Sequence, residues 1–134
     1  MLPDFDDNGN LPPGIYRCLL AEVVARFGRG SPEREVETTE LVAFTHWARQ
    51  AGIKRLLVDG SYVTRKQSPN DVDLVILPGP EQPEQAEIAL DMANIWPFLH
   101  IQVALDAADL KQWAEKDFGA DRSGIPRGVV EIEL

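Results

Sequence analysis

Two short apolar runs, each joined to a polar motif, constrain the fold of this chain more than any other feature. The first run, Leu56–Val58, is followed closely by a turn at Gly60 and Ser61. Further along, Asp71 and Asp73 open the second apolar run. Residues i and i+2 of a strand project from the same face, about 6.6 Å apart. We therefore expect the two aspartates to share one face at the start of a buried strand.

Carboxylates this close, near a glycine turn, indicate metal and phosphate chemistry. Two neighbouring carboxylates repel each other, and a bound divalent cation removes that penalty. A turn that leads into a helix presents free backbone N–H groups to phosphate oxygens. We expect Mg²⁺ or Mn²⁺ at Asp71 and Asp73, with phosphates at Gly60 and Ser61. The alternative is a solvated strand end, because Ser-Pro-Asn-Asp is also ordinary turn sequence.

The arrangement resembles the signature of the DNA polymerase beta-like nucleotidyltransferase superfamily, in which a Gly-Ser turn precedes Asp-x-Asp on a strand. The matching residues are Gly60, Ser61, Asp71 and Asp73. The resemblance implies that the aspartates hold two magnesium ions, and that the turn and the following helix start receive the phosphates of a nucleoside triphosphate. Two metals about 3.5–4 Å apart can bind the attacking and leaving oxygens of an in-line displacement.

A second resemblance covers nearly the whole chain. Residues 3–14, the central Asp59–Thr64 and the ending Asp121–Leu134 are similar to a family of small bacterial proteins usually assigned to the nucleotidyltransferase fold. The resemblance implies a minimal nucleotidyltransferase fold of the α/β (α+β) class, a mixed β-sheet with flanking helices. Some relatives of such proteins act as antitoxins beside a toxin gene, which implies a toxin-like protein or a modification target as a partner.

Size and charge limit the remaining possibilities. At 134 residues the chain is expected to form one domain, residues 15–134, preceded by an extended arm, residues 1–14. The net charge of −9 argues against general nucleic-acid binding, which requires a basic face. A mononucleotide site remains compatible, because bound magnesium would supply positive charge. A single cysteine and the lack of an apolar run of membrane-spanning length predict a cytoplasmic protein without a membrane segment.

Apolar spacing and capping residues predict the other elements. Helices are expected over residues 19–27, 32–51, 84–95 and 107 to about 118, and strands over residues 53–58, 72–77, 98–105 and 129–134. In the strand over residues 72–77, we expect Val75 and Leu77 to share the face of the aspartates. The last strand is expected at a sheet edge with one face exposed. Glu131 and Glu133 are then solvated, or complete a site if that strand lies beside the aspartates.

A third acid is the weak point of the resemblance. Active members of the superfamily usually add one acid from a neighbouring strand, and the corresponding position here is Gln102. A neutral amide is a poor magnesium ligand and cannot act as a base. His100 is expected to share a face with Gln102 and is most simply paired within the sheet. Thr64 and Lys66 are candidate phosphate contacts, although exposed lysines are usually solvated.

Two functions follow as hypotheses. In the first, the protein is a magnesium-dependent nucleotidyltransferase that moves a nucleoside monophosphate from a nucleoside triphosphate to a hydroxyl on a protein or small molecule. In the second, it is a regulatory or antitoxin-like binding module that keeps the fold without robust catalysis. Gln102 favours the second hypothesis, while Asp71 and Asp73 favour the first.

Overall fold

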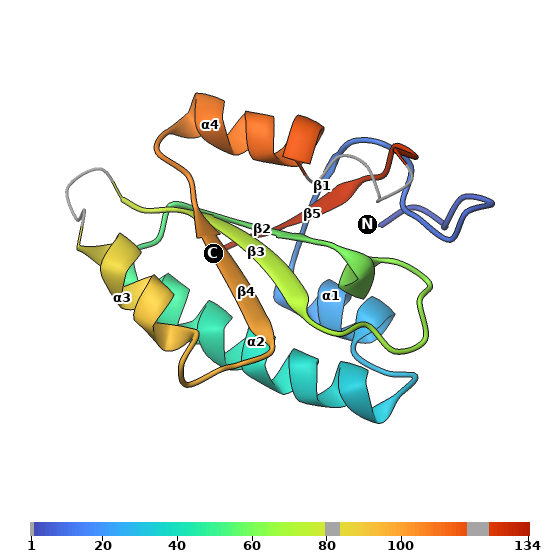
Figure 1. Ribbon diagram of the computed structural model, residues 1–134, viewed down its shortest axis with the longest axis horizontal. Helices are drawn as coiled ribbons and strands as arrows, with labels where there is room; N and C mark the ends of the chain where they lie inside the picture. The colour runs from blue at the N-terminus through green and yellow to red at the C-terminus, as the bar shows by residue number, and fades with distance from the viewer. Residues whose placement is uncertain (1, 80–83, 118–123) are drawn as a thin grey trace.

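A mixed five-stranded sheet forms the centre of the computed structural model, which describes residues 2–79, 84–117 and 124–134 (Figure 1). The strands lie in the order β1-β5-β2-β3-β4. Strand β2 runs antiparallel to both β3 and β5, whereas the pairs β1–β5 and β3–β4 are parallel. The strands are β1 (Ile15–Cys18), β2 (Arg55–Asp59), β3 (Val72–Leu77), β4 (Leu99–Val103) and β5 (Val129–Ile132).

Four α-helices are present in the described residues, and Figure 1 shows α1, α2 and α3 on one side of the sheet and α4 on the other. Their bounds are α1 (Leu20–Phe27), α2 (Pro32–Ala51), α3 (Gln85–Met92) and α4 (Ala107–Gln112), the last followed by a π-helical turn over Trp113–Asp117. The predicted α+β class with a mixed sheet is confirmed. The expected helix end near Phe118 lies outside the described residues. No helix in the described ranges has the length and apolar character to cross a bilayer.

Capping chemistry accounts for the helix bounds that the sequence predicted. Helix α2 begins where the Ser31 hydroxyl accepts a hydrogen bond from the Arg34 N–H at 3.2 Å, with Pro32 at the first position. It ends at Gly52, whose φ of 79° favours glycine. Helix α4 begins where the Asp106 carboxylate accepts the Asp109 N–H at 2.8 Å.

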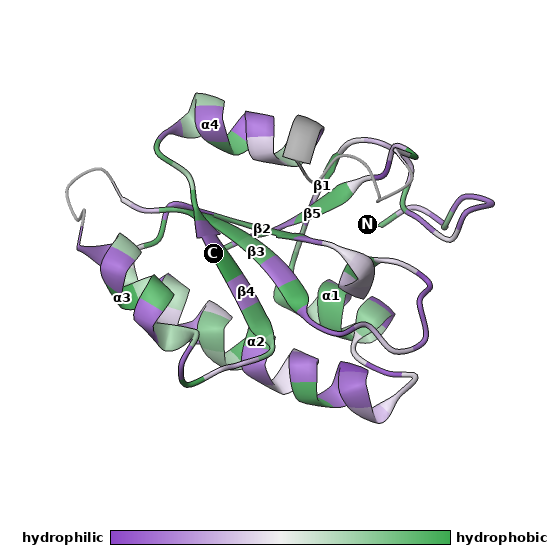
Figure 2. Ribbon diagram, viewed as in Figure 1, coloured by the Kyte–Doolittle hydropathy of each residue, from purple (hydrophilic) through white to green (hydrophobic). Residues whose placement is uncertain are grey.

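The two faces of the sheet carry separate cores. On the side of α1, α2 and α3, the packed strand residues include Leu56, Val58, Val72, Leu74 and Ile76. On the side of α4, the packed residues include Leu57, Val75, Leu77, Leu110 and Val129. Figure 2 shows hydrophobic colour concentrated on the central strands and mixed colours on the helices. Alternation along β3 therefore places Asp73 on the face of Val75 and Leu77, as predicted.

The C-terminal strand does not lie at a sheet edge, so that prediction was wrong. Strand β5 lies between β1 and β2, and all four of its residues are buried. The edge strand next to β5 is β1, a four-residue strand that the sequence analysis did not predict. Its partly exposed sequence, Ile-Tyr-Arg-Cys, lacks the doubly apolar character of β3. Pairing in parallel with β5 gives this short segment its strand conformation.

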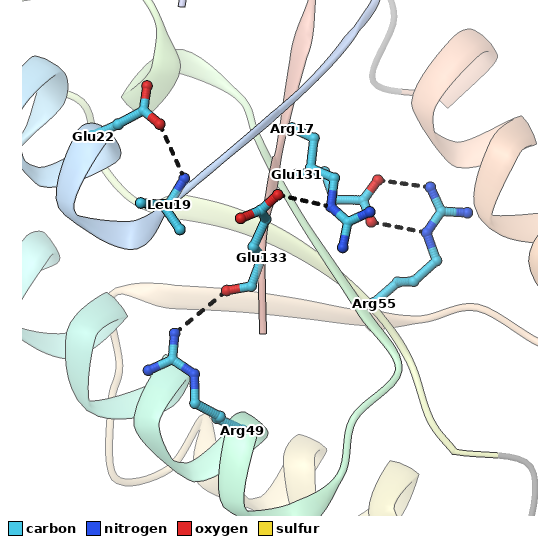
Figure 3. A network of polar contacts seen from close by, with 7 residues as sticks. All are labelled: Arg17, Leu19, Glu22, Arg49, Arg55, Glu131 and Glu133. Carbon is cyan, nitrogen blue, oxygen red and sulfur yellow. Dashed lines mark hydrogen bonds and ion pairs between the residues drawn. The ribbon is translucent and has the colours of Figure 1, made fainter. Parts of the chain in front are cut away.

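Burial of β5 also changes the role of its acids (Figure 3). Glu131 is 8% exposed and accepts two hydrogen bonds from the Arg55 guanidinium, at 2.9 and 2.7 Å. This bidentate pair compensates the buried carboxylate. Glu133 remains partly exposed and lies 3.4 Å from Arg17. Solvation, the simpler expectation for both acids, is thus wrong for Glu131.

Arg34 donates more side-chain hydrogen bonds than the other polar residues of the described structure. Its side chain is buried, and its Nε, Nη1 and Nη2 groups donate hydrogen bonds to four backbone carbonyls. The acceptors are the carbonyl oxygens of Phe27 (3.0 Å), Tyr62 (2.8 Å), Thr64 (2.8 Å) and Lys66 (3.1 and 2.6 Å). One guanidinium therefore ties α2 to the end of α1 and to the segment after the Gly60-Ser61 turn.

We expect Arg34→Lys to lower the free energy of unfolding by about 3 kcal/mol, because an ammonium group cannot satisfy the carbonyls that the planar guanidinium reaches. Urea denaturation measures the change. Arg49→Lys is the matched control on the same helix, since Arg49 is exposed and makes one 3.4 Å hydrogen bond to the Glu133 carbonyl. Equal stability of the two variants would contradict the assigned role of Arg34.

A second buried group on α2 is a carboxylate without a hydrogen-bond partner in the described structure. Glu37 is completely buried, and neither of its carboxylate oxygens has a hydrogen-bond partner in the described structure. Burial raises the pKa of this carboxyl from 4.5 to about 7. The positive charge of Arg34 lowers the pKa, and the negative charge of Asp71 raises it further. Because the folded pKa exceeds the unfolded one, folding takes up a proton between these values, and stability falls as pH rises through them.

We expect Glu37→Gln to remove this pH dependence. Relative to the variant, the wild-type protein should lose about 2 kcal/mol of unfolding free energy between about pH 5 and pH 8. Denaturant titrations at both pH values measure the difference. Glu35→Gln, an exposed acid on the same helix, should leave the wild-type pH dependence intact. A parallel pH profile for Glu37→Gln and wild type would show that Glu37 titrates normally.

Candidate functional site

The paired ends of β2 and β3 bring two acids face to face. In the antiparallel register, Asp59 lies directly opposite Asp73. Directly opposite residues of such a pair project from the same face, with their Cβ atoms about 5 Å apart. Both acids therefore lie on the α4 side of the sheet, beyond the apolar patch that includes Leu57 and Val75.

Asp59 is the more buried of the two acids. It is 1% exposed, and neither carboxylate oxygen accepts a hydrogen bond within the described structure. Arg127 Nη2 lies 3.6 Å from Asp59 Oδ2, an ion-pair distance rather than a hydrogen bond. Burial raises the pKa of Asp59 to about 7, while Arg127 and the nearby Gly60 N–H lower it only in part. The result is a buried carboxylate whose negative charge is incompletely compensated.

Asp73 begins a chain of polar contacts across the neighbouring strand. Its Oδ1 accepts a hydrogen bond from His100 Nδ1 at 3.1 Å, and Gln102 Nε2 lies 3.3 Å from His100 Nε2. An amide nitrogen can only donate, so this geometry fits a neutral imidazole protonated on Nδ1. Burial raises the pKa of Asp73, and Asp71 raises it further, whereas the His100 hydrogen bond lowers it.

Register decides which residue of β4 is nearest the aspartates. His100 pairs with Asp73, and Gln102 pairs with Val75. Gln102 thus shares the predicted face but contacts Asp73 only through His100. Asp71 lies directly before β3 and is partly exposed, and its charge raises the pKa of both Asp73 and Glu37. Asp71 therefore stands near the rim of the sheet, within electrostatic range of acids on both faces.

The Gly60-Ser61 turn packs directly against Asp73. Gly60 has φ 80°, and a Cβ at this position would lie 2.0 Å from Asp73 Oδ2. Only glycine permits this approach. The helical segment that follows, Ser61–Val63, is a single 3-10 turn, so it offers fewer aligned N–H groups than the helix start that the resemblance implies. The Ser61 hydroxyl has no hydrogen-bond partner among the described residues.

The two other predicted phosphate contacts occupy different environments. Thr64 is buried, and its hydroxyl donates to the Ser61 carbonyl at 2.6 Å and accepts the Lys66 N–H at 3.2 Å. Its only hydroxyl proton is therefore committed to shaping the turn. Lys66 is exposed, and its ammonium has no ion-pair partner within the described ranges.

Magnesium has a partial donor set at this end of the sheet. Among the described residues, no group of three His, Cys, Asp or Glu side chains is arranged to hold a metal ion. Asp71 and Asp73 nevertheless offer two carboxylates, which is the number that magnesium usually takes from a protein when substrate phosphates supply other ligands. The excess negative charge of Asp59 beside them adds electrostatic attraction for a cation. These residues fit a magnesium ion that arrives with phosphate.

Sequence comparison places the chain in a family. A family model described as "Family of unknown function (DUF6932)" matches residues 3–133. The chain belongs to DUF6932. No curated protein and no solved structure matches it. The DUF6932 match spans all five strands, and therefore includes the Gly60-Ser61 turn and each acid of the candidate site.

We expect Gly60→Ala to be far more damaging than Gly124→Ala, which makes Gly124 a matched control. Both glycines have positive φ, 80° and 78°, but an added Cβ at Gly124 meets no atom of the described residues within 4 Å. Gly124→Ala should cost about 1–2 kcal/mol of backbone strain, and Gly60→Ala should add the clash with Asp73.

Thermal and urea unfolding measure both costs. The double variant Gly60→Ala/Asp73→Ala should recover most of the extra loss, because truncating Asp73 removes the clashing oxygen. Equal losses for the two glycine variants, or additive losses in the double variant, would show that Asp73 does not pack against this turn.

Proposed function

We propose that this protein is a magnesium-dependent nucleotidyltransferase that transfers a nucleoside monophosphate from a nucleoside triphosphate to a hydroxyl on a protein or small molecule. One observation carries the proposal. The Asp73 carboxylate lies against Gly60, opposite the incompletely compensated Asp59 and beside Asp71. Carboxylates concentrated beside this turn attract a divalent cation, which would in turn attract the phosphates of a nucleotide.

Magnesium, held by Asp71 and Asp73, would neutralise charge on the phosphates and on the leaving pyrophosphate. The chain's own residues supply orientation. The turn at Gly60 and Ser61 positions the phosphates, and the free Ser61 hydroxyl is available to donate to a phosphate oxygen. Most of the rate enhancement in such transfers comes from positioning and charge stabilisation rather than from covalent chemistry.

Proton removal from the acceptor hydroxyl falls to His100. Asp73 accepts a hydrogen bond from the Nδ1–H group, which leaves the unprotonated Nε2 as the nitrogen that can take up a proton. The His100 side chain is 60% exposed, so an acceptor can reach it. As the acceptor oxygen bonds to the α-phosphorus and pyrophosphate leaves, the hydroxyl proton passes to this nitrogen. Gln102 would have to release Nε2 for this step.

A regulatory binding module is the second candidate, and the composition of β4 favours it. The two β4 side chains on the aspartate face are His100 and Gln102, so neither supplies a third carboxylate. Such a protein would bind nucleotide or a toxin-like protein partner without rapid transfer. In either case we place it in the cytoplasm, where nucleoside triphosphates and magnesium are abundant and a lone thiol, the buried Cys18, stays reduced.

We expect a magnesium–nucleoside triphosphate mixture to stabilise the wild-type protein, by about 2.7 kcal/mol when the ligand is at 100 times its dissociation constant. Asp71→Asn/Asp73→Asn should abolish that stabilisation in thermal-shift assays. The charge-matched control is Asp7→Asn/Asp91→Asn, which removes two exposed acids elsewhere. Stabilisation that survives in Asp71→Asn/Asp73→Asn would refute the site.

Transfer of label from α-labelled nucleoside triphosphates to protein and small-molecule hydroxyls separates the two candidates. Transfer that His100→Gln reduces by about 10²-fold or more, with nucleotide binding retained, supports the enzyme and the role of His100 as base. Nucleotide binding without transfer in the wild type supports the regulatory module.

A further inference from the structure

A basic pocket lies beside the loop that follows the Gly60-Ser61 turn. It has a volume of about 170 Å³ and is formed by the N-terminal arm, the end of α1, the start of α2 and the loop after the Gly60-Ser61 turn. The lining includes five of the chain's 13 Lys and Arg residues, namely Arg26, Arg29, Arg34, Arg65 and Lys66. This concentration of positive charge contrasts with the whole chain, whose net charge is −9.

None of these five basic side chains forms an ion pair of 4 Å or less with a carboxylate in the described structure, although Arg34 is close enough to Glu37 to lower the pKa of that carboxyl. Within the described ranges, the ion pairs that form involve other basic residues, namely Arg17, Arg55, His100, Lys111 and Arg127. Three of the basic residues, Arg26, Arg34 and Arg65, instead contact backbone carbonyls and aromatic rings. Arg26, for example, donates to the Pro3 carbonyl at 2.9 Å and lies 4.4 Å from the centre of the Phe5 ring. These contacts hold the three arginines in place without a direct ion pair to a carboxylate.

Some side chains of the pocket are held by hydrogen bonds, and others are available to bind a ligand. Arg34 uses all its donors on backbone carbonyls, including those of Thr64 and Lys66, and so fixes the loop that forms one wall. Gln67 ties the same loop to the Gly30 carbonyl at 2.8 Å. Arg29 and Lys66 are exposed, and their side chains have no hydrogen-bond or ion-pair partner in the described structure. Two free cations thus line a preorganised wall.

We propose that this pocket is an anion site for inorganic phosphate or pyrophosphate, or for a phosphate group of a larger ligand, with Arg29 and Lys66 as its direct contacts. Guanidinium and ammonium groups form strong charge-assisted hydrogen bonds to phosphate oxygens. The volume holds about five waters, well below the roughly 300 Å³ of a pocket for a whole small molecule. That size fits a phosphate group rather than a nucleoside.

This site differs from the one assigned to the magnesium–nucleotide. Its lining contains none of Asp59, Gly60, Asp71, Asp73 or His100, although it does contain Thr64 and Lys66, both predicted from the sequence as contacts of the nucleotide phosphates. Arg34 comes from α2, which packs on the sheet face opposite to Asp73. The site therefore needs no metal, and its existence does not depend on the nucleotidyltransferase proposal.

Titration calorimetry with phosphate, pyrophosphate and tripolyphosphate, in EDTA and at low ionic strength, tests the site. We expect saturable binding to the wild-type protein. Arg29→Gln/Lys66→Gln should weaken it by about tenfold or more, because two charge-assisted hydrogen bonds are lost. Binding should also weaken with added sodium chloride.

Arg49→Gln/Lys54→Gln is the charge-matched control, because it also removes an exposed arginine and an exposed lysine. We expect this control to bind like wild type. Asp71→Asn/Asp73→Asn should also retain binding in EDTA, which separates this site from the magnesium site. No binding to wild type, or equal weakening in both basic-residue variants, would overturn the proposal. Tighter binding of a nucleoside triphosphate than of tripolyphosphate would identify the phosphate as part of a nucleotide.

Discussion

The hydrogen bonds of Arg34 to backbone carbonyls hold together the parts of the protein on which the candidate site depends. The segment over residues 62–66 has no regular hydrogen-bonded partner strand, so its carbonyls need donors from elsewhere. One buried guanidinium supplies them and anchors the segment to α2. Because this segment directly follows Gly60, the same hydrogen bonds support the turn that packs against Asp73. These hydrogen bonds fix the backbone of residues 62–66 in the way that strand pairing fixes the backbone of a sheet.

Uncompensated negative charge is the second constraint. Glu37 on one face of the sheet and Asp59 on the other are both buried, and burial raises the pKa of each to about 7. Asp71 raises the pKa of Glu37 as well as that of Asp73. Such an arrangement lowers stability as pH rises from about 4 to about 7, and amides or apolar residues at these positions would avoid that loss. A cation at Asp71 and Asp73 would relieve the part of this cost that those two acids cause.

The strand and helix pattern was largely predictable because local chemistry determines it. Ser31, Pro32 and Gly52 set the limits of α2, and alternation sorts the residues of β3 onto two faces. Strand β1 escaped prediction because its stability comes from pairing with β5, a segment far away in the sequence. Because β1 pairs with β5, β5 lies in the interior of the sheet and not at the predicted edge.

Within the site, the aspartates and the glycine turn were visible in sequence, but their neighbours depend on register. Pairing of β3 with β4 places His100, rather than Gln102, beside Asp73. A histidine and a carboxylate make different demands at this position. A carboxylate would add a metal ligand and a third negative charge. The Nδ1 atom of His100 cannot coordinate a metal while it carries the proton that it donates to Asp73. Under the proposed function, the site is better suited to one magnesium ion delivered with a nucleotide than to a preformed two-metal centre, because β4 places no carboxylate beside Asp73.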